Sequence, residues 1–119
     1  MFNISVIIPT IHANPDLLDQ CCLAVRDTAS DAELIIADEG SFSENCNRGA
    51  LLANNPILVF LNDDTIPQPG WLEALTGPLN DPEIGITGAR LTYPDNTLQH
   101  AGIYFDAPDN ILTAHNITE

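Results

Sequence analysis

The chain contains no lysine, and its strongly basic side chains are three arginines, Arg26, Arg48 and Arg90. Seventeen acidic residues give the 119 residues a formal net charge of −14 at pH 7. A surface with this charge repels nucleic acid backbones and anionic lipid headgroups, so we expect no nucleic acid and no membrane as partners. It also repels a phosphate-bearing ligand, unless a metal cation binds between the two.

Cysteine is scarce too, and Cys21, Cys22 and Cys46 are odd in number, with two of them adjacent. This pattern is not a disulfide framework and favours a reducing compartment. The N-terminal "MFNISVIIPT" has no basic start, and its short apolar run stops at a proline. We therefore expect neither a signal peptide nor a membrane helix, and we predict a soluble, cytoplasmic protein.

Several phosphate- and metal-binding motifs are absent. Without lysine there is no P-loop, and no GxGxxG follows the first apolar run. The segment "NDDTIPQPG" lacks the alternating acids and central glycine of an EF-hand loop. The DxDxT pattern of haloacid-dehalogenase-type phosphatases is also excluded, because Leu61 stands two residues before Asp63.

The composition, 45% hydrophobic and 17% charged, is that of an ordinary globular protein, and the length predicts one domain over residues 1–119. Apolar β-branched runs alternate with segments of helical periodicity. This alternation predicts an α/β fold with a mainly parallel sheet covered by helices. The expected strands are 4–9, 33–38, 57–61, 84–94, 98–105 and 111–116, and the expected helices are 14–28, 43–53 and 69–79.

The ends of the first three strands carry the most informative side chains, because ligands of open α/β sheets bind beyond the carboxyl ends of the strands. Pro9-Thr10, Asp38-Glu39 and Asn62-Asp63-Asp64 stand at these ends. Two carboxylates ~6 Å apart repel by about 2–3 kcal/mol at an effective dielectric near 20, and a divalent cation would remove this penalty. The spacing predicts a metal-assisted anion site, and its alternative is ordinary turn chemistry after a strand.

Five segments appear in an order that resembles a known family: "SVIIPT", "ELIIADEGS", "CNRGA", "ILVFLNDDTIPQPGWLEAL" and "GARLTYPDNTLQHAGI". Together they resemble the donor-binding half of a family 2 glycosyltransferase, over about residues 4–105. The resemblance implies a GT-A-like (Rossmann-like) three-layer α/β/α sandwich, truncated relative to full-length members. The "NDD" at 62–64 resembles the DxD-type motif that binds a nucleotide sugar and its divalent metal.

At the base end, the resemblance implies that Pro9 and Thr10 line the pocket for the nucleotide base. Asp38 would accept a hydrogen bond from the imide N–H of uracil or thymine, with Glu39 as the alternative. From the residues alone, Thr10 has a second interpretation as a helix cap, and Asp38 has one as a turn residue.

At the phosphate end, the resemblance implies that Asn47 and Arg48 lie over the base or reach the diphosphate. Asp63 would bind the ribose hydroxyls, and Asp64 would coordinate Mn²⁺ or Mg²⁺. Arg48 has a second interpretation as a solvated helix charge. Later in the chain, His100 and His115 are candidates to complete the metal shell, although a histidine on a strand is more often packed or hydrogen-bonded.

These assignments predict metal-dependent binding of a UDP-sugar with glycosyl transfer, or hydrolysis when no acceptor is held. The alternative is a non-catalytic nucleotide-binding module that acts as the donor half of a larger assembly. No acid after Asp64 stands in a context that marks it as the general base, so none is assigned. Open edges in the later strands further predict a homo-oligomer.

Overall fold

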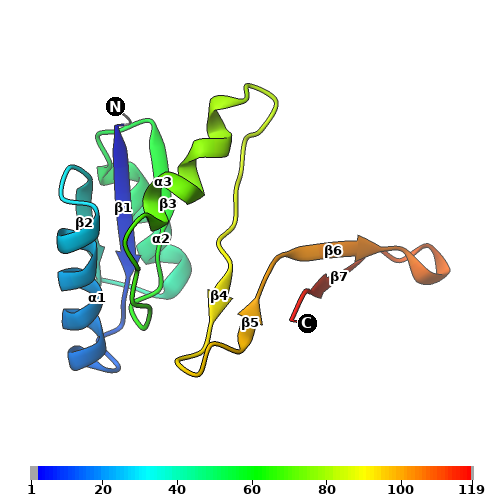
Figure 1. Ribbon diagram of the computed structural model, residues 1–119, viewed down its shortest axis with the longest axis horizontal. Helices are drawn as coiled ribbons and strands as arrows, with labels where there is room; N and C mark the ends of the chain where they lie inside the picture. Colours follow the sequence, from blue (N-terminus) through cyan, green and yellow to red (C-terminus); the bar gives the residue numbers. More distant parts are fainter. Residues whose placement is uncertain (1–2, 119) are drawn as a thin grey trace. The chain divides into compact units, whose positions relative to one another are not determined.

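A computed structural model describes residues 3–118 of the chain, which divides into two compact units (Figure 1). The N-terminal unit ends at Leu72, and the C-terminal unit begins at Glu73. Among the described residues, no helix combines the length and apolar character that crossing a bilayer requires.

The N-terminal unit is built on a three-stranded parallel sheet of order β2-β1-β3. Its strands are β1 (Ile4–Pro9), β2 (Glu33–Ala37) and β3 (Ile57–Phe60). Every residue of β1 is buried, as expected for a central strand covered on both faces. The sequence therefore predicted the position of each of these strands to within one residue, and their parallel pairing is confirmed.

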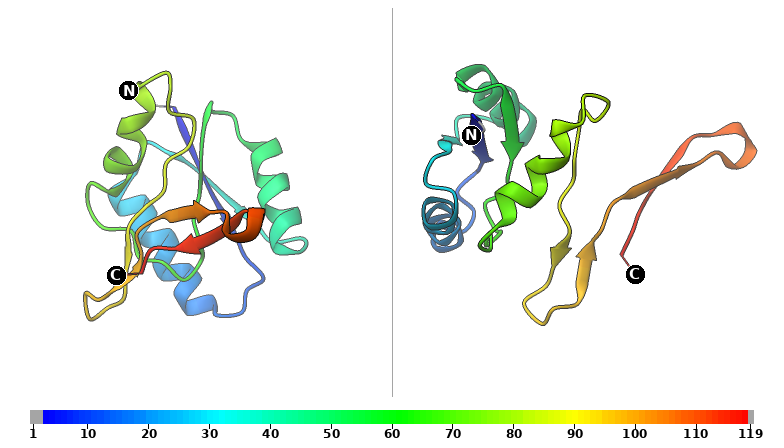
Figure 2. Two further views of the ribbon diagram at one scale, coloured as in Figure 1. Left: turned by 90° about the vertical axis from the view of Figure 1, so that its right-hand side faces the viewer. Right: turned by 45° about the horizontal axis from the view of Figure 1, so that its top comes forward.

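Helices α1 (Pro15–Thr28) and α2 (Phe42–Leu52) lie on opposite faces of this sheet, so the unit has three layers (Figures 1 and 2). Asn14 caps α1 as predicted, because its side chain accepts a hydrogen bond from the backbone N–H of Leu17 (3.2 Å). Buried residues of α1 recur at helical spacing, at Leu18, Cys21, Cys22 and Val25. Right-handed β-α-β crossovers to either side of β1 account for the two covered faces.

Glu33 closes the amino-terminal edge of this sheet and is a carboxylate with three donors. It accepts from the Asn54 side chain (2.6 Å), the Asn54 backbone N–H (2.9 Å) and the Ser5 hydroxyl (2.7 Å). These hydrogen bonds, those of Asn54 first, lower the pKa of Glu33. The carboxylate therefore fastens the segment before β3 to the start of β1 and β2.

Glu33→Gln is expected to destabilise the protein at pH 7, with the deficit shrinking as the pH falls. Because the pKa is lower in the folded state, stabilisation is complete above the ordinary glutamate pKa of about 4.3 and is lost as the pH falls through the lower folded value. Urea midpoints at pH 7 and in steps below pH 5 measure the effect, with Glu73→Gln, an exposed site, as the control. Equal urea midpoints for Glu33→Gln and wild type at pH 7 would show that the Glu33 carboxylate does not stabilise the fold.

The C-terminal unit departs from the predicted mainly parallel sheet. Its strands form two antiparallel pairs, β4 (Leu91–Thr92) with β5 (Leu98–His100), and β6 (Ile103–Asp106) with β7 (Thr113–Asn116). Neither pair joins the three-stranded sheet. The continuation of the β-α-β alternation beyond β3 was therefore predicted wrongly.

Two of the later predicted strands were wrong in extent, and glycine explains both. Of the segment 84–94 only Leu91 and Thr92 form a strand; Gly85 and Gly88 stand in the irregular part. The segment 98–105 divides into β5 and β6 at Gly102, whose φ of +132° an L-residue rarely adopts. The predicted strand 111–116 is shorter and begins at Thr113.

The third predicted helix is shorter as well. Helix α3 (Trp71–Thr76) gives way to a 3₁₀ turn, η1 (Gly77–Asn80). Pro78 has no N–H to continue an α-helix, so the chain tightens there. At the other end, Gly70 has a φ of +83°, and the helix begins one residue later rather than at Pro69.

Candidate functional site at the carboxyl edge of the sheet

The carboxyl ends of β1 and β3 and the start of α2 surround a pocket of about 260 Å³. We call it the acidic pocket. It brings together four of the predicted site residues, Pro9, Thr10, Asp63 and Asp64. Its remaining lining residues are Ile11, Phe42, Asn45 and Asn62.

Thr10 joins the ends of all three strands. Its hydroxyl donates to Oδ2 of Asp63 (2.6 Å), and its backbone N–H donates to the carbonyl of Ala37 at the end of β2 (2.9 Å). Thr10 is buried, and the first helix is capped by Asn14 instead. The alternative interpretation of Thr10 as a helix cap is therefore wrong.

Asn45 is a pocket residue that the sequence reasoning did not identify. Its amide Nδ2 donates to the carbonyls of Thr10 (3.2 Å) and Gly40 (2.9 Å), and its Oδ1 accepts from the Gly40 N–H (2.9 Å). The side chain is fully buried, and these bonds satisfy it. An asparagine on the buried face of α2, four residues before Gly49, was the signal in the sequence.

A side chain of α1 hydrogen-bonds to the backbone of the loop after β3. Cys21 Sγ donates to the carbonyl of Asn62 (3.6 Å), which also accepts from the Thr65 hydroxyl (2.8 Å). Burial raises the pKa of the Cys21 thiol, so it remains protonated and acts as a donor. This contact places the backbone that carries Asp63 and Asp64.

The two neighbouring carboxylates are held differently. Asp63 is half-buried and bonded to Thr10, whereas Asp64 is exposed and has no hydrogen bond or ion pair to another described residue. Among residues 3–118, no cluster of three or more His, Cys, Asp or Glu side chains could hold a metal. An exposed carboxylate such as that of Asp64 is chemically suited to a hard divalent cation, which prefers oxygen ligands.

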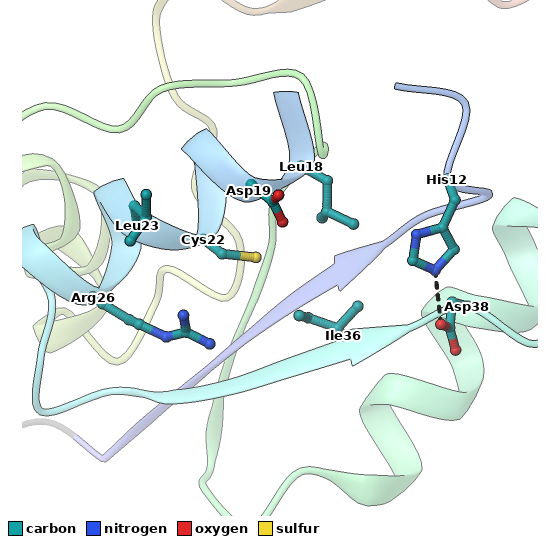
Figure 3. Close-up of a pocket in the computed structure, with 8 residues that line it drawn as sticks. All are labelled: His12, Leu18, Asp19, Cys22, Leu23, Arg26, Ile36 and Asp38. Carbon is teal, nitrogen blue, oxygen red and sulfur yellow. Dashed lines mark hydrogen bonds and ion pairs between the residues drawn. The ribbon is translucent and has the colours of Figure 1, made fainter. Parts of the chain in front are cut away.

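Asp38 lies in a neighbouring pocket of about 600 Å³, which we call the α1 pocket (Figure 3). There Asp38 Oδ2 pairs with His12 Nε2 at 2.8 Å. The pocket is lined by His12, Leu18, Asp19, Cys22, Leu23, Arg26, Ile36 and Asp38. The acids after β2 and β3 therefore line two pockets rather than one shared crevice.

Glu39, Asn47 and Arg48 line neither pocket. Arg48 and Glu39 form an ion pair (2.7 Å) with both side chains more than half exposed, and Asn47 is exposed. An exposed pair of this kind contributes little to stability, so it leaves Arg48 free to exchange partners.

His100 and His115 belong to the C-terminal unit. His115 Nε2 contacts Asp106 Oδ1 (3.0 Å), and its ring stacks on Tyr104 with centroids 4.9 Å apart. His100 lies in β5, opposite Leu91. A role for either histidine in a metal site with Asp64 remains a prediction.

Comparison with known proteins decides the family. Residues 41–105, more than half of the chain, match the sequence model described as Glycosyl transferase family 2. The chain belongs to glycosyltransferase family 2. This membership implies the GT-A fold, with which the parallel three-stranded sheet and its helices are compatible. The resemblance inferred from the motifs is thereby confirmed.

Two curated proteins are similar to parts of this family 2 chain. O-antigen biosynthesis protein RfbC of Myxococcus xanthus is 40% identical over 58 residues, which are 48% of this chain and 4% of that protein. Uncharacterized protein y4gI of Sinorhizobium fredii (strain NBRC 101917 / NGR234) is 32% identical over 72 residues, 58% of this chain and 8% of that protein. The matches thus cover less than a tenth of either relative. No solved structure matches the chain.

Proposed function

We propose that this family 2 chain binds a UDP-sugar together with Mn²⁺ or Mg²⁺ and serves glycosyl transfer. One observation carries the proposal: Asp63 and Asp64 line the same pocket as Pro9 and Thr10, at the carboxyl edge of a parallel sheet. The name of the relative RfbC, an O-antigen biosynthesis protein, supports a saccharide product.

The hydrogen bonds favour distinct roles for the two aspartates. Because Thr10 occupies Oδ2 of Asp63, the other oxygen is left to accept from a ribose hydroxyl. The exposed carboxylate of Asp64 would hold the cation. Bound there, the cation supplies positive charge against the diphosphate leaving group.

The remaining roles extend from these two. Asp38, or Glu39 as the alternative, would read the base, and Pro9 would line its site. Asn47 and Arg48 would lie over the base or reach the diphosphate after Arg48 leaves Glu39. His100 and His115 stay candidate ligands that complete the cation's shell.

The acceptor and the general base are not assigned to any residue. When no acceptor is held, the proposed reaction is hydrolysis of the UDP-sugar, with water as the second substrate. A donor-binding module without turnover is the alternative function. A cytoplasmic location fits the three free thiols, Cys21, Cys22 and Cys46. Self-association remains a prediction, in keeping with the exposed Ile103 and Phe105 of β6.

UDP binding is expected to require a divalent cation, since a diphosphate approaches a chain of net charge −14. Calorimetry with UDP in Mn²⁺, in Mg²⁺ and in EDTA measures this dependence. Equal affinity in EDTA and in Mn²⁺ would refute the cation role. Release of UDP from UDP-sugars, followed by chromatography, then separates an enzyme from a module that binds without turnover.

A further inference from the structure

A chain of hydrogen bonds connects the two pockets through the loop after β1. His12 Nε2 contacts Asp38 Oδ2 (2.8 Å), the His12 backbone N–H donates to Thr10 Oγ1 (3.0 Å), and Thr10 Oγ1 donates to Asp63 Oδ2 (2.6 Å). The carboxylate after β2 and the carboxylate after β3 are thus joined across the end of β1. His12 is the link, because its backbone serves one side and its imidazole the other.

The backbone of His12 has an uncommon conformation. Its φ of 57° lies in the left-handed region, which is unfavourable for a residue with a Cβ. The two hydrogen bonds of His12 compensate for this cost, and the turn aims the imidazole at Asp38 (Figure 3). Glycine would suit this backbone better and would lack the imidazole.

Asp38 retains capacity to accept another donor. Its Oδ2 contacts His12, while Oδ1 has no hydrogen bond to a described residue, and 44% of the side chain is exposed. The apolar side chains of Leu18 and Ile36 lie beside the pair in the same pocket (Figure 3). This setting suits a planar ring that brings an N–H to the free oxygen.

We propose that His12 is a positioning residue for base recognition. It holds Oδ2 of Asp38 so that Oδ1 accepts from the imide N–H of the base, and through Thr10 it keeps this carboxylate in register with Asp63. The inference rests on the proposed UDP-sugar binding and names its discriminating feature, a nucleoside diphosphate whose base carries an imide N–H. Cytosine has an acceptor at that position and is disfavoured.

Other charged groups face the same site, so total affinity for a nucleotide is not a clean measure of base discrimination. Asp19 and Arg26 of α1 carry opposite charges and line the α1 pocket together with His12. Asp63 is connected to the His12 backbone through the Thr10 hydroxyl. The ratio of UDP to CDP affinity isolates the effect, because both ligands carry the same diphosphate and cation.

The test uses two variants with Mn²⁺ present. His12→Gly suits the left-handed backbone and removes the donor, so the UDP preference over CDP is expected to fall about five- to tenfold at pH 7.5. His12→Gln keeps a neutral N–H donor, so its preference is expected to stay within about twofold of wild type.

Fluorescence of Trp71, the single tryptophan, checks that each variant is folded, since its indole donates to Thr28 in the N-terminal unit (2.8 Å). If UDP binds and His12→Gly keeps the full preference, the role of His12 is overturned and the proposed function stands. If the wild-type protein binds UDP and CDP with equal affinity, the role of His12 in base recognition is also overturned. Absence of UDP binding to wild type in Mn²⁺ overturns the proposed function itself, and the inference with it.

Discussion

Gly49→Ala is expected to destabilise the N-terminal unit, although alanine is the better helix former. A Cβ at Gly49 would lie 2.3 Å from Cγ2 of Ile7, a fully buried and β-branched side chain of the central strand. Overpacking typically costs about 1–3 kcal/mol, and the gain in helix propensity offsets roughly 1 kcal/mol of it. We expect a net loss of up to about 2 kcal/mol, because α2 must move away from β1.

Urea unfolding followed by Trp71 fluorescence measures this loss. Gly85→Ala is the matched control, since nothing lies within 4 Å of a Cβ there. The double variant Gly49→Ala with Ile7→Leu removes the Cγ2 methyl and is expected to regain part of the stability. A more stable Gly49→Ala would show that helix propensity outweighs the contact, and that α2 does not need this close approach.

Asp64→Asn is expected to remove the enhancement of UDP binding by Mn²⁺. The neutral amide is a much weaker ligand for a hard cation, and losing a contact to a charged group typically costs about 1.5–3 kcal/mol, roughly 10- to 150-fold in affinity. Asp63→Asn is expected to weaken UDP binding both with and without the cation, because Asp63 is assigned to the ribose. The two neighbouring aspartates should therefore give different patterns in calorimetry.

Each of these variants also removes one negative charge, which by itself favours an anionic ligand. Asp31→Asn, in the exposed turn before β2, carries the same change of charge away from the pocket and serves as the control. If Asp64→Asn retains the wild-type ratio of affinities in Mn²⁺ and EDTA, Asp64 does not hold the cation. If both variants behave alike, the separate roles of Asp63 and Asp64 are wrong.

Local chemistry made much of the N-terminal unit predictable. Three of its features depend on neighbouring residues only, so the sequence alone predicts them: the β-branched, mostly apolar run of β1, the Asn14-Pro15 start of α1 and the acidic pair after β3. The ordered motifs likewise identified the family, which the match over residues 41–105 confirms. The sequence also indicated which strand ends carry site residues, because parallel strands share one edge.

Tertiary structure decided which partners these residues have. The segment 84–94 has the composition of a strand, yet a strand forms only where it pairs with another strand. Within this segment only Leu91 and Thr92 pair, with β5. Asp38 resembles the other strand-end acids in sequence, but the left-handed turn at His12 brings an imidazole to it. Asn45 is an ordinary helix residue until the fold places Thr10 and Gly40 around its amide. A sequence specifies local conformation over short range, whereas hydrogen-bond partners distant in the chain are chosen only when the layers pack.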